Sequence, residues 1–255
     1  MNAKIYVVMH KQDTVPKVEG NYTLFVGANG KKPIYTDYTD DKGDNISDKN
    51  PNYCELTGLY WIWKNSDADI TGLCHYRRFL TTSRFSNESR FFLTANVAKK
   101  LLNDYDIILP QSYVLYDTVK RKINFAPNIN DMNEVEEAIR RVTPEYLEDY
   151  FWFMSQNKIH LFNIMICKKS LLDNYCSWLF PILKEFDRIH DMSVETGYRA
   201  RLDGMLSERL LNIWVHHNIP DHKIREMRWV QTDQNNNALV VEIKSFIKEI
   251  IWKFR

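Results

Sequence analysis

The sequence is poor in glycine and almost without net charge. Glycine makes up 8 of the 255 residues, about 3% where ~7% is usual. Lys and Arg number 34 against 33 Asp and Glu, which leaves a formal charge of +1. No overall field therefore attracts nucleic acid, and no excess of charge favours disorder. A histone-like protein, a charged tail and a nucleic-acid partner are excluded as first expectations.

Cysteine pairs and long apolar runs are also missing. The four cysteines, Cys54, Cys74, Cys167 and Cys176, form no CxxC pair and stand at no zinc-ligand spacing, so we expect reduced and mostly buried thiols. The N-terminal apolar run is too short for the core of a signal peptide, and no stretch approaches the ~18 apolar residues of a membrane span. We expect a cytoplasmic protein that carries no standard signal and crosses no membrane.

Several common catalytic motifs are absent. The sequence contains no G-x-x-x-x-G-K-[ST], no G-x-G-x-x-G, no H-E-x-x-H and no G-x-S-x-G. The nucleotide-triphosphatase, dehydrogenase, zinc-protease and α/β-hydrolase interpretations therefore lose their main support.

Aromatic residues, by contrast, are plentiful. The chain has 14 Tyr, 13 Phe and 7 Trp, which together make up 13% of it. With so few glycines, these rings favour a rigid body with a cleft for planar or sugar-like ligands. At ~100–200 residues per domain, the length corresponds to one large or two small domains with a real core.

Apolar and β-branched runs alternate with segments of helical periodicity. Strands are expected over residues 4–10, 23–26, 70–80, 105–110 and 161–167; helices are expected over 52–64, 97–103 and 205–217, after Ser170, and twice within 131–157 with a break at Thr143-Pro144. This alternation predicts an α/β fold with a mostly parallel central sheet and helices on both faces. Ligands in such folds bind beyond the carboxyl ends of the strands.

Capping residues predict two of the helix starts. Asn50 is expected to be an N-cap, with Pro51 at the first helical position. Ser170 is expected to cap the helix that follows it, with Asp173 three residues later as in a variant capping box. The polar segment before the first of these helices, residues 31–50, is expected to be an ordered loop that carries function.

The end of the chain differs from the rest. We divide the sequence into a main domain, residues 1–235, and a C-terminal amphipathic helix, residues 236–255. The helix has an apolar stripe of Val240, Ile243, Ile247, Ile250 and Phe254 opposite charged residues. Such a helix either lies on a membrane surface, here the inner face of the plasma membrane, or docks on the domain or on a second subunit of a homodimer.

A basic and aromatic cluster ends one predicted buried strand. It reads His75-Tyr76-Arg77-Arg78, and two guanidiniums beside a His and a Tyr offer fixed donors that match the oxygens of a diphosphate. The alternative is that the arginines pair with acidic neighbours or point to opposite faces of the strand.

A second candidate is Glu208. On a helical wheel it lies nearly opposite Leu206 and Leu210, and it is expected near the start of its helix, where the dipole stabilises a carboxylate. The alternative is a solvated surface glutamate.

A third candidate is the segment over residues 43–55. Its carboxamides and carboxylates could form hydrogen bonds with a base, a ribose or a sugar. The alternative is that these side chains only stabilise a turn and cap a helix.

Five long strings stand out in the sequence. They are DNISDKNPNYCELTGLYWIWKN (residues 44–65), GLCHYRRFL (72–80), YDIILP (105–110), FNIMICKKSLLDNYCSWLFPIL (162–183) and GMLSERLLNIW (204–214). Together they resemble the DUF4422 family of bacterial glycosyltransferases, which are found in capsule, exopolysaccharide and O-antigen gene clusters. The resemblance runs from about residue 4 to residue 217. The family usually shows Gly-Phe-Leu-Ala-Glu-Arg where this chain has Gly-Met-Leu-Ser-Glu-Arg, so the Glu and the Arg are kept.

The resemblance implies a GT-A-like nucleotide-sugar-binding fold. It also implies transfer of a sugar from a nucleoside-diphosphate donor, with UDP-galactofuranose or another UDP-hexose expected, to a lipid-linked or oligosaccharide acceptor in surface polysaccharide synthesis. In GT-A enzymes an Asp-x-Asp motif at a strand end usually holds a divalent metal on the donor. Here that strand end has no carboxylate, and Asp67 and Asp69, which precede the strand, are interpreted as turn residues. We therefore expect Arg77 and Arg78, with His75, to neutralise the leaving diphosphate, with no metal or other cofactor required.

The resemblance also implies roles for single residues. Glu208 is expected to be the general base of an inverting transfer. The residues expected to bind the donor are Lys11, Asp44, Asn45, Glu55, His75, Tyr76, Arg77, Arg78 and Arg209, and those expected to meet the acceptor are Asn163 and Arg199.

Two alternative functions stay open. A non-catalytic glycan-binding subunit of a polysaccharide assembly complex needs no positioned Glu, and a nucleotide phosphohydrolase normally needs metal-binding carboxylate clusters that the sequence does not show.

Overall fold

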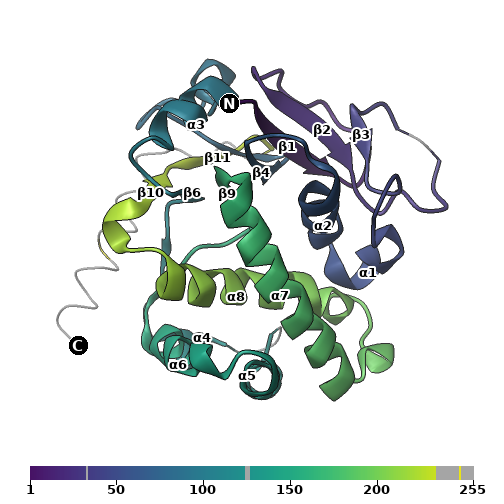
Figure 1. Cartoon of the computed structure of the whole chain (residues 1–255), viewed down its shortest axis with the longest axis vertical. Coiled ribbons are helices and arrows are strands. Elements are labelled where there is room, and N and C mark those ends of the chain that lie inside the picture. The colour runs from purple at the N-terminus through teal and green to yellow at the C-terminus, as the bar shows by residue number, and fades with distance from the viewer. Residues whose placement is uncertain (33, 124–126, 234–246, 248–255) are drawn as a thin grey trace.

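A twisted sheet runs through the computed structural model, which describes residues 1–32, 34–123, 127–233 and 247 (Figure 1). Within these residues the sheet has nine strands. The main path runs in the order β10 (Ile224–Met227), β6 (Ile107–Pro110), β9 (Met165–Lys168), β4 (Ile70–His75), β1 (Ala3–Met9), β2 (Asn21–Phe25) and β3 (Tyr38–Thr39). A short ribbon of β5 (Arg78–Leu80) and β11 (Trp229–Gln231) joins it at β4.

Strand β9 runs against the rest of the main path. The pairs of β1 with β2 and β4, of β2 with β3 and of β6 with β10 are parallel, whereas β9 is antiparallel to both β4 and β6. The predicted mostly parallel sheet is therefore confirmed. Because β9 is reversed, the residues that precede it lie at the same edge as the residues that follow β4.

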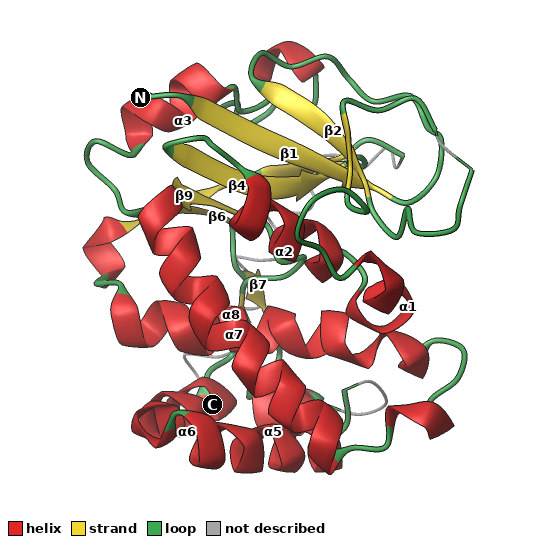
Figure 2. Cartoon of the chain, turned by 45° about the vertical axis from the view of Figure 1, so that its right-hand side comes forward, coloured by secondary structure: helices red, strands yellow, loops and turns green. Residues whose placement is uncertain are grey.

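Helices cover both faces of the sheet. Along β1, Tyr6 and Val8 face one core, with α2 (Leu56–Asn65), α7 (Lys169–Ile189) and α8 (Leu202–Asn218), while Ile5 and Val7 face a second core under α3 (Ala95–Leu101). Figure 2 shows α2 and α3 on opposite sides of the strands. Gly58 lets α2 approach closely, because a Cβ there would lie 2.8 Å from the Val26 side chain. The alternation of buried side chains thus sets the two layers.

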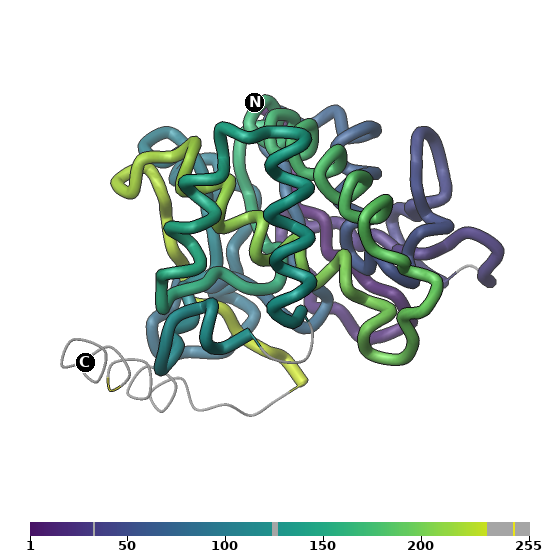
Figure 3. The backbone as a smooth tube through the Cα atoms, turned by 90° about the horizontal axis from the view of Figure 1, so that it is seen from below, coloured from purple at the N-terminus to yellow at the C-terminus, as the bar shows by residue number. Residues whose placement is uncertain are grey.

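A second group of helices extends the first core away from the sheet. It comprises α4 (Val119–Lys122), α5 (Ile129–Val142) and α6 (Leu147–Ser155), with a small ribbon of β7 (Tyr113–Val114) and β8 (Lys158–Ile159). Figure 3, seen from below, shows α5 beside α7. The predicted break at Thr143-Pro144 is confirmed, since a 3-10 turn over Pro144–Tyr146 separates α5 from α6. Other 3-10 turns lie at Ser47–Lys49, Ser89–Phe91, Met192–Val194, Arg199–Arg201 and Asp221–Lys223.

Three predicted element boundaries are wrong. The helix expected over 52–64 is two helices, α1 (Asn50–Tyr53) and α2, because Cys54 adopts a positive φ of 51° between them. Asn50 is not the N-cap; its side-chain amide donates to the Cys54 carbonyl oxygen (2.7 Å) and so holds the break. The strand expected over 70–80 turns back on itself after His75, so that Arg78 pairs with His75.

Two further expectations about helix starts are also wrong. Ser170 does not cap α7, which begins at Lys169 with no side-chain cap; instead, the Lys169 ammonium pairs with Asp173 at 2.5 Å. Helix α8 begins at Leu202, so Glu208 is its seventh residue and lies beyond the first turn. The helix dipole, which acts within the first turn, therefore contributes little to Glu208.

The predicted C-terminal helix, residues 236–255, lies outside the described residues apart from Ile247. The expected membrane or subunit contact of that helix and the division at residue 235 stay predictions. Within the described part of the chain, no helix is long and apolar enough to cross a membrane.

A buried pair of carboxyl groups joins α7 to α8. Asp203 is fully buried, and burial together with Asp187 raises its pKa to about 8. Asp203 is therefore protonated at neutral pH, close to Asp187, which accepts from the Tyr53 hydroxyl at 2.8 Å. Lys49 lies 3.7 Å from the same carboxylate. Protonation of Asp203 thus removes the repulsion between two acidic groups that would arise if both were ionised.

We predict that this pair makes the protein less stable as the pH rises. Between pH 3.8, the ordinary pKa of Asp, and about 8, the unfolded chain releases the Asp203 proton while the folded chain keeps it, so stability falls across that window. Asp203→Asn supplies a permanent donor and should gain in melting temperature over wild type between pH 5 and pH 8. Exposed Asp221→Asn is the matched control. A constant difference between Asp203→Asn and wild type over this range would contradict the raised pKa of Asp203.

Candidate active site

Segments far apart in the sequence meet at the carboxyl edge of the sheet. His75 ends β4, Phe162 and Asn163 precede the reversed β9, Glu55 lies between α1 and α2, and Glu208 projects from α8. Four of these side chains, those of Glu55, His75, Asn163 and Glu208, therefore converge at the carboxyl ends of the strands, where a ligand site was expected.

The turn before β9 holds the centre of the site. Phe162 and Asn163 both have positive φ, at 75° and 53°. This conformation directs the Phe162 N–H to Glu208 Oε1 (2.9 Å), while the Phe162 carbonyl oxygen accepts from His75 Nε2 (2.6 Å). Burial lowers the pKa of His75 to about 4, so the ring is neutral at pH 7. Its proton is on Nε2, and its Nδ1 lone pair is left as an acceptor.

Asn163 connects the second carboxylate to α8. Its buried side-chain amide donates to Glu55 Oε1 (2.8 Å) and to Ser207 Oγ (2.7 Å), and Ser207 in turn donates to the Gly204 carbonyl oxygen (2.8 Å). Burial raises the pKa of Glu55, while the bond from Asn163 opposes that rise. Glu55 and Glu208 therefore share one site, each held by one residue of the same turn.

Unusual backbone geometry is concentrated here. Among the described residues, three non-glycine residues have positive φ: Cys54, Phe162 and Asn163. Cys54 immediately precedes Glu55, and the other two bind Glu208 and Glu55 directly. Such conformations cost of order 1–3 kcal/mol each and persist where the surrounding structure imposes them, which is often at functional sites.

The environment of Glu208 suits a proton acceptor. Its side chain is 18% exposed, and Arg209 donates to Oε2 at 2.9 Å. Burial raises the pKa of Glu208, Arg209 lowers it, and the nearby Glu55 raises it further. The alternative of a solvated surface glutamate is therefore not what the structure shows. A carboxylate with a raised pKa and a remaining path to solvent is a better base near neutral pH than an ordinary surface glutamate.

Three buried polar atoms of the site have no partner within the described chain. They are Arg78 Nε, Arg209 Nε and Asn163 Oδ1. The Arg78 guanidinium lies 4.4 Å from the centre of the Phe162 ring, beside the turn. Buried polar groups are rarely left unpaired, so two unpaired donors and one acceptor around the same turn indicate a polar, anionic ligand.

The two adjacent arginines point to different places. Arg77 pairs with Asp13 (3.5 Å) and Asp233 (3.0 Å) and stacks on Tyr76, whereas Arg78 lies at the turn. Arg77 therefore pairs with acidic neighbours, which was the alternative to diphosphate binding. Tyr76 is buried against His10 in an edge-to-face contact.

Other predicted residues lie apart from this cluster. Asp44 accepts from the Tyr60 hydroxyl of α2 (3.2 Å), whereas Asn45 makes a local turn contact by donating to the Gly43 carbonyl oxygen (2.8 Å). Arg199 pairs with Asp131 (2.9 Å) and Glu195. Lys11 is exposed beyond β1. Their expected ligand roles stay predictions.

Sequence reasoning missed two contributors. Arg201 donates from Nε to Cys54 Sγ (3.3 Å) and acts electrostatically on Glu55, and Ser207 anchors Asn163. Arg201 precedes the string over residues 204–214, and Ser207 lies inside it. Both residues are close to Glu208 in the sequence, and this proximity could have identified them as part of the site.

Two other groups of residues with possible metal ligands lie away from this site in the described part of the chain. Asp67 pairs with Lys4 (2.7 Å) and Asp69 accepts from the Asn2 N–H (2.7 Å), at the amino end of β4, so both are turn residues. The ligand atoms of Asp131, Glu134 and His190 lie within 4.8 Å of one another. Arg199 pairs with this group, which therefore forms an ion-pair network.

The fold and this site define an α/β protein with a mostly parallel sheet and a carboxylate and guanidinium site at its carboxyl edge. The chain belongs to the DUF4422 family, described as a domain of unknown function, whose model matches residues 4–219. It is similar to the apo structure of the bifunctional glycosyltransferase WbbM, with a TM-score of 0.82 and 27% identity. The match covers 92% of this chain but 46% of the WbbM chain, so this chain spans about half of that protein. Among curated proteins, none matches the sequence.

We predict that neutralising Glu55 stabilises the fold at neutral pH. Because burial raises its pKa, the ionised group is less favourable in the folded than in the unfolded chain, and stability falls as the pH rises through that range. Glu55→Gln removes the charge and should raise the melting temperature at pH 7.5 by about 2–4 °C for each kcal/mol recovered.

The gain should vanish at low pH, where wild type is itself protonated. The matched control is Glu148→Gln, an exposed residue of α6, which should leave the melting temperature unchanged. A lower melting temperature for Glu55→Gln at pH 7.5 would show that the ionised carboxylate stabilises the fold instead.

Proposed function

We propose that the protein is a glycosyltransferase with a GT-A-like fold. It transfers a sugar from a nucleoside-diphosphate donor to a glycan or lipid-linked acceptor in bacterial surface polysaccharide synthesis. The observation that carries this proposal is one site that holds Glu208, a largely buried carboxylate with a raised pKa, together with Arg78 and Arg209, whose Nε groups have no partner within the described chain. The similarity to WbbM supports the same class of reaction.

The geometry supports an inverting displacement. Glu208 accepts the proton of an acceptor hydroxyl as the hydroxyl oxygen attacks the anomeric carbon. The bond from that carbon to the diphosphate oxygen breaks, and the diphosphate leaves with the electron pair. Arg78 and Arg209 stabilise the developing negative charge through charge-assisted hydrogen bonds. The Phe162 N–H orients Glu208 from the side of the sheet.

The same residues indicate how the site would bind the nucleotide-sugar donor. The end of β4 offers His75 and Arg78 and no carboxylate, so guanidinium groups replace a metal ion as the partner of the diphosphate. Glu55 and the side-chain oxygen Oδ1 of Asn163 then accept bonds from sugar hydroxyls. UDP-galactofuranose or another UDP-hexose is the donor we propose.

We expect Glu208→Gln to lose transfer activity by about 10²–10⁴-fold, the usual contribution of a general base. Glu208→Asp, which keeps the carboxylate at a shorter reach, should lose less. Both are measured as release of nucleoside diphosphate in the presence of acceptor, with exposed Glu148→Gln as control. Near-normal turnover by Glu208→Gln would exclude it as the base. Binding of nucleotide sugars without any transfer would favour a non-catalytic glycan-binding subunit.

A separate prediction concerns the diphosphate. Activity should survive EDTA, and Arg78→Ala should weaken binding of UDP by about tenfold or more, since a hydrogen bond to a charged group contributes ~1.5–3 kcal/mol. Arg90→Ala, an exposed arginine paired with Glu88, is the control. Activity abolished by EDTA and restored by manganese would contradict the arginine-based site. A thermal-shift screen of UDP-, GDP-, CMP- and dTDP-sugars identifies the donor class.

A further inference from the structure

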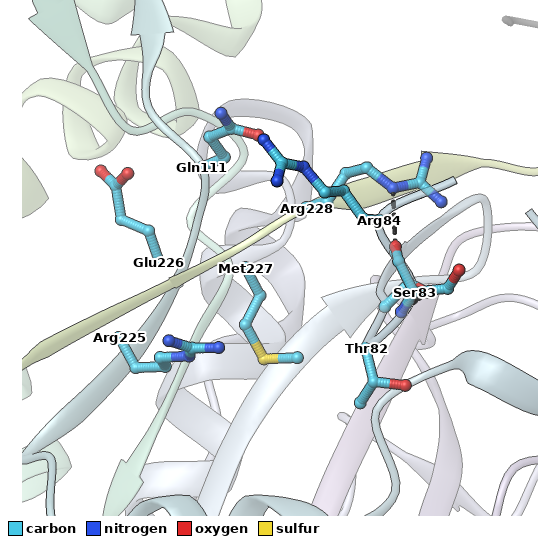
Figure 4. Close-up of a pocket in the computed structure, with 9 residues that line it drawn as sticks. Thr82, Ser83, Arg84, Gln111, Arg225, Glu226, Met227 and Arg228 are labelled. Carbon is cyan, nitrogen blue, oxygen red and sulfur yellow. Dashed lines mark hydrogen bonds between the residues drawn. The ribbon is translucent and has the colours of Figure 1, made fainter. Parts of the chain in front are cut away.

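A second recess lies along the carboxyl edge of the sheet. It has a volume of about 370 Å³ and lies where β6 and β10 end, beside the segment that follows β5 (Figure 4). Residues 81–84, Gln111 and residues 225–228 line it. The expected donor and acceptor residues all lie outside this recess, so it is a separate part of the edge.

The recess has an excess of positive charge. Its lining contains three arginines and one carboxylate, that of Glu226, and two of the arginines, Arg84 and Arg228, interact with other groups. The carboxylate is engaged elsewhere, because His160 Nε2 lies 2.7 Å from Glu226 Oε1. Side chains alternate along a strand, and Figure 4 shows Glu226 pointing away from Arg225 and Met227. Arg225 itself lies 5.7 Å from the Tyr105 ring centre and has no carboxylate partner among the described residues.

The opposite wall is held rigidly. Arg228 donates from Nε to the Ser83 carbonyl oxygen (3.0 Å) and from a terminal nitrogen to Asn87 Oδ1 (2.9 Å), and it also binds the Ser86 carbonyl oxygen. The Ser83 hydroxyl oxygen accepts from the Ser86 N–H (2.9 Å), so its own hydrogen is available to a ligand. The wall therefore presents a fixed hydroxyl donor across from Arg225.

Two sets of contacts connect the recess to Glu208. In the first, Glu226 binds His160, whose backbone carbonyl oxygen accepts from Asn212 Nδ2 (2.9 Å), and Asn212 also donates to the Glu208 carbonyl oxygen (2.7 Å). In the second, Trp229 lies edge-to-face on Phe162 with ring centres 4.8 Å apart. These contacts thus couple the recess to the segment that carries Glu208, and the recess lies on the side of the sheet edge away from β1 and β2.

We propose that this recess binds a phosphate group of the acceptor, while the acceptor hydroxyl lies at Glu208; this rests on the proposed transferase function. A phosphate ester carries one or two negative charges and several acceptor oxygens, which match the guanidinium of Arg225 and the hydroxyl of Ser83. A neutral sugar requires no such charge. The phosphate belongs either to a lipid carrier or to a phosphorylated glycan.

The test observes the arginine side chains directly by NMR. The Nε–H signals of ¹⁵N-labelled protein are followed during titration with methyl phosphate, and the Arg225 signal is assigned from its loss in Arg225→Lys. We expect the Arg225 signal to shift saturably and that of exposed Arg90 to stay. Arg225→Gln should weaken binding by about tenfold or more, followed through the Arg228 signal. An Arg225 signal that moves no more than that of Arg90, or binding unchanged in Arg225→Gln, would overturn the proposal.

Two further titrations separate the sources of the phosphate and the two proposals. Farnesyl phosphate in neutral detergent micelles and galactose 1-phosphate should both shift Arg225; the tighter ligand indicates a lipid-linked or a phosphorylated-glycan acceptor. UDP should shift Arg78. If UDP moves Arg78 while methyl phosphate leaves Arg225 unmoved, the recess proposal fails alone. If methyl phosphate moves Arg225 while no nucleotide moves Arg78, the transferase function fails and the phosphate site stands.

Discussion

Two hydrogen bonds from the left-handed turn at Phe162 and Asn163 hold both carboxylates of the site. The Phe162 N–H binds Glu208, and the Asn163 amide binds Glu55. This turn lies at the carboxyl edge because β9 is antiparallel to its neighbours β4 and β6. A parallel strand in that position would place the turn at the opposite edge. The direction of one strand therefore decides whether α8, the segment between α1 and α2, and the end of β4 form a single site.

The site is arranged at a cost to the fold. Burial raises the pKa of Glu55 and of Glu208, and it lowers that of His75, so at each of these groups the fold disfavours the charged form. Arg78 and Arg209 keep buried nitrogens without partners within the described chain. A bound diphosphate would relieve the second of these features, since it supplies negative oxygens to the two arginines. Ligand binding and stability are therefore linked at this edge.

Periodicity and composition predicted the sheet, the helices on both faces and the break at Thr143-Pro144 because these depend on local burial patterns. They did not predict the break at Cys54 or the turn at Phe162 and Asn163, because positive φ at non-glycine residues is imposed by tertiary contacts. His75, Arg78 and Asn163 were expected on strands and do lie at one edge of the sheet, where Glu208 of helix α8 meets them. Arg77 and Arg78 look equivalent in sequence, yet one pairs with Asp13 and Asp233 and the other faces the turn. Only the reversal of the chain after His75 separates them.

The central claim is that Glu208, in its buried setting beside Glu55, is the proton acceptor of the reaction. The pH dependence of kcat/KM tests it most directly, because this ratio reports the ionisation of the free enzyme. The account predicts that the rate rises with pH through a pKa above 4.5, the ordinary value for Glu. It also predicts that Glu55→Gln, which removes a neighbouring negative charge, moves this rise to lower pH. A rise centred at or below 4.5, or one that Glu55→Gln leaves in place, would contradict the account.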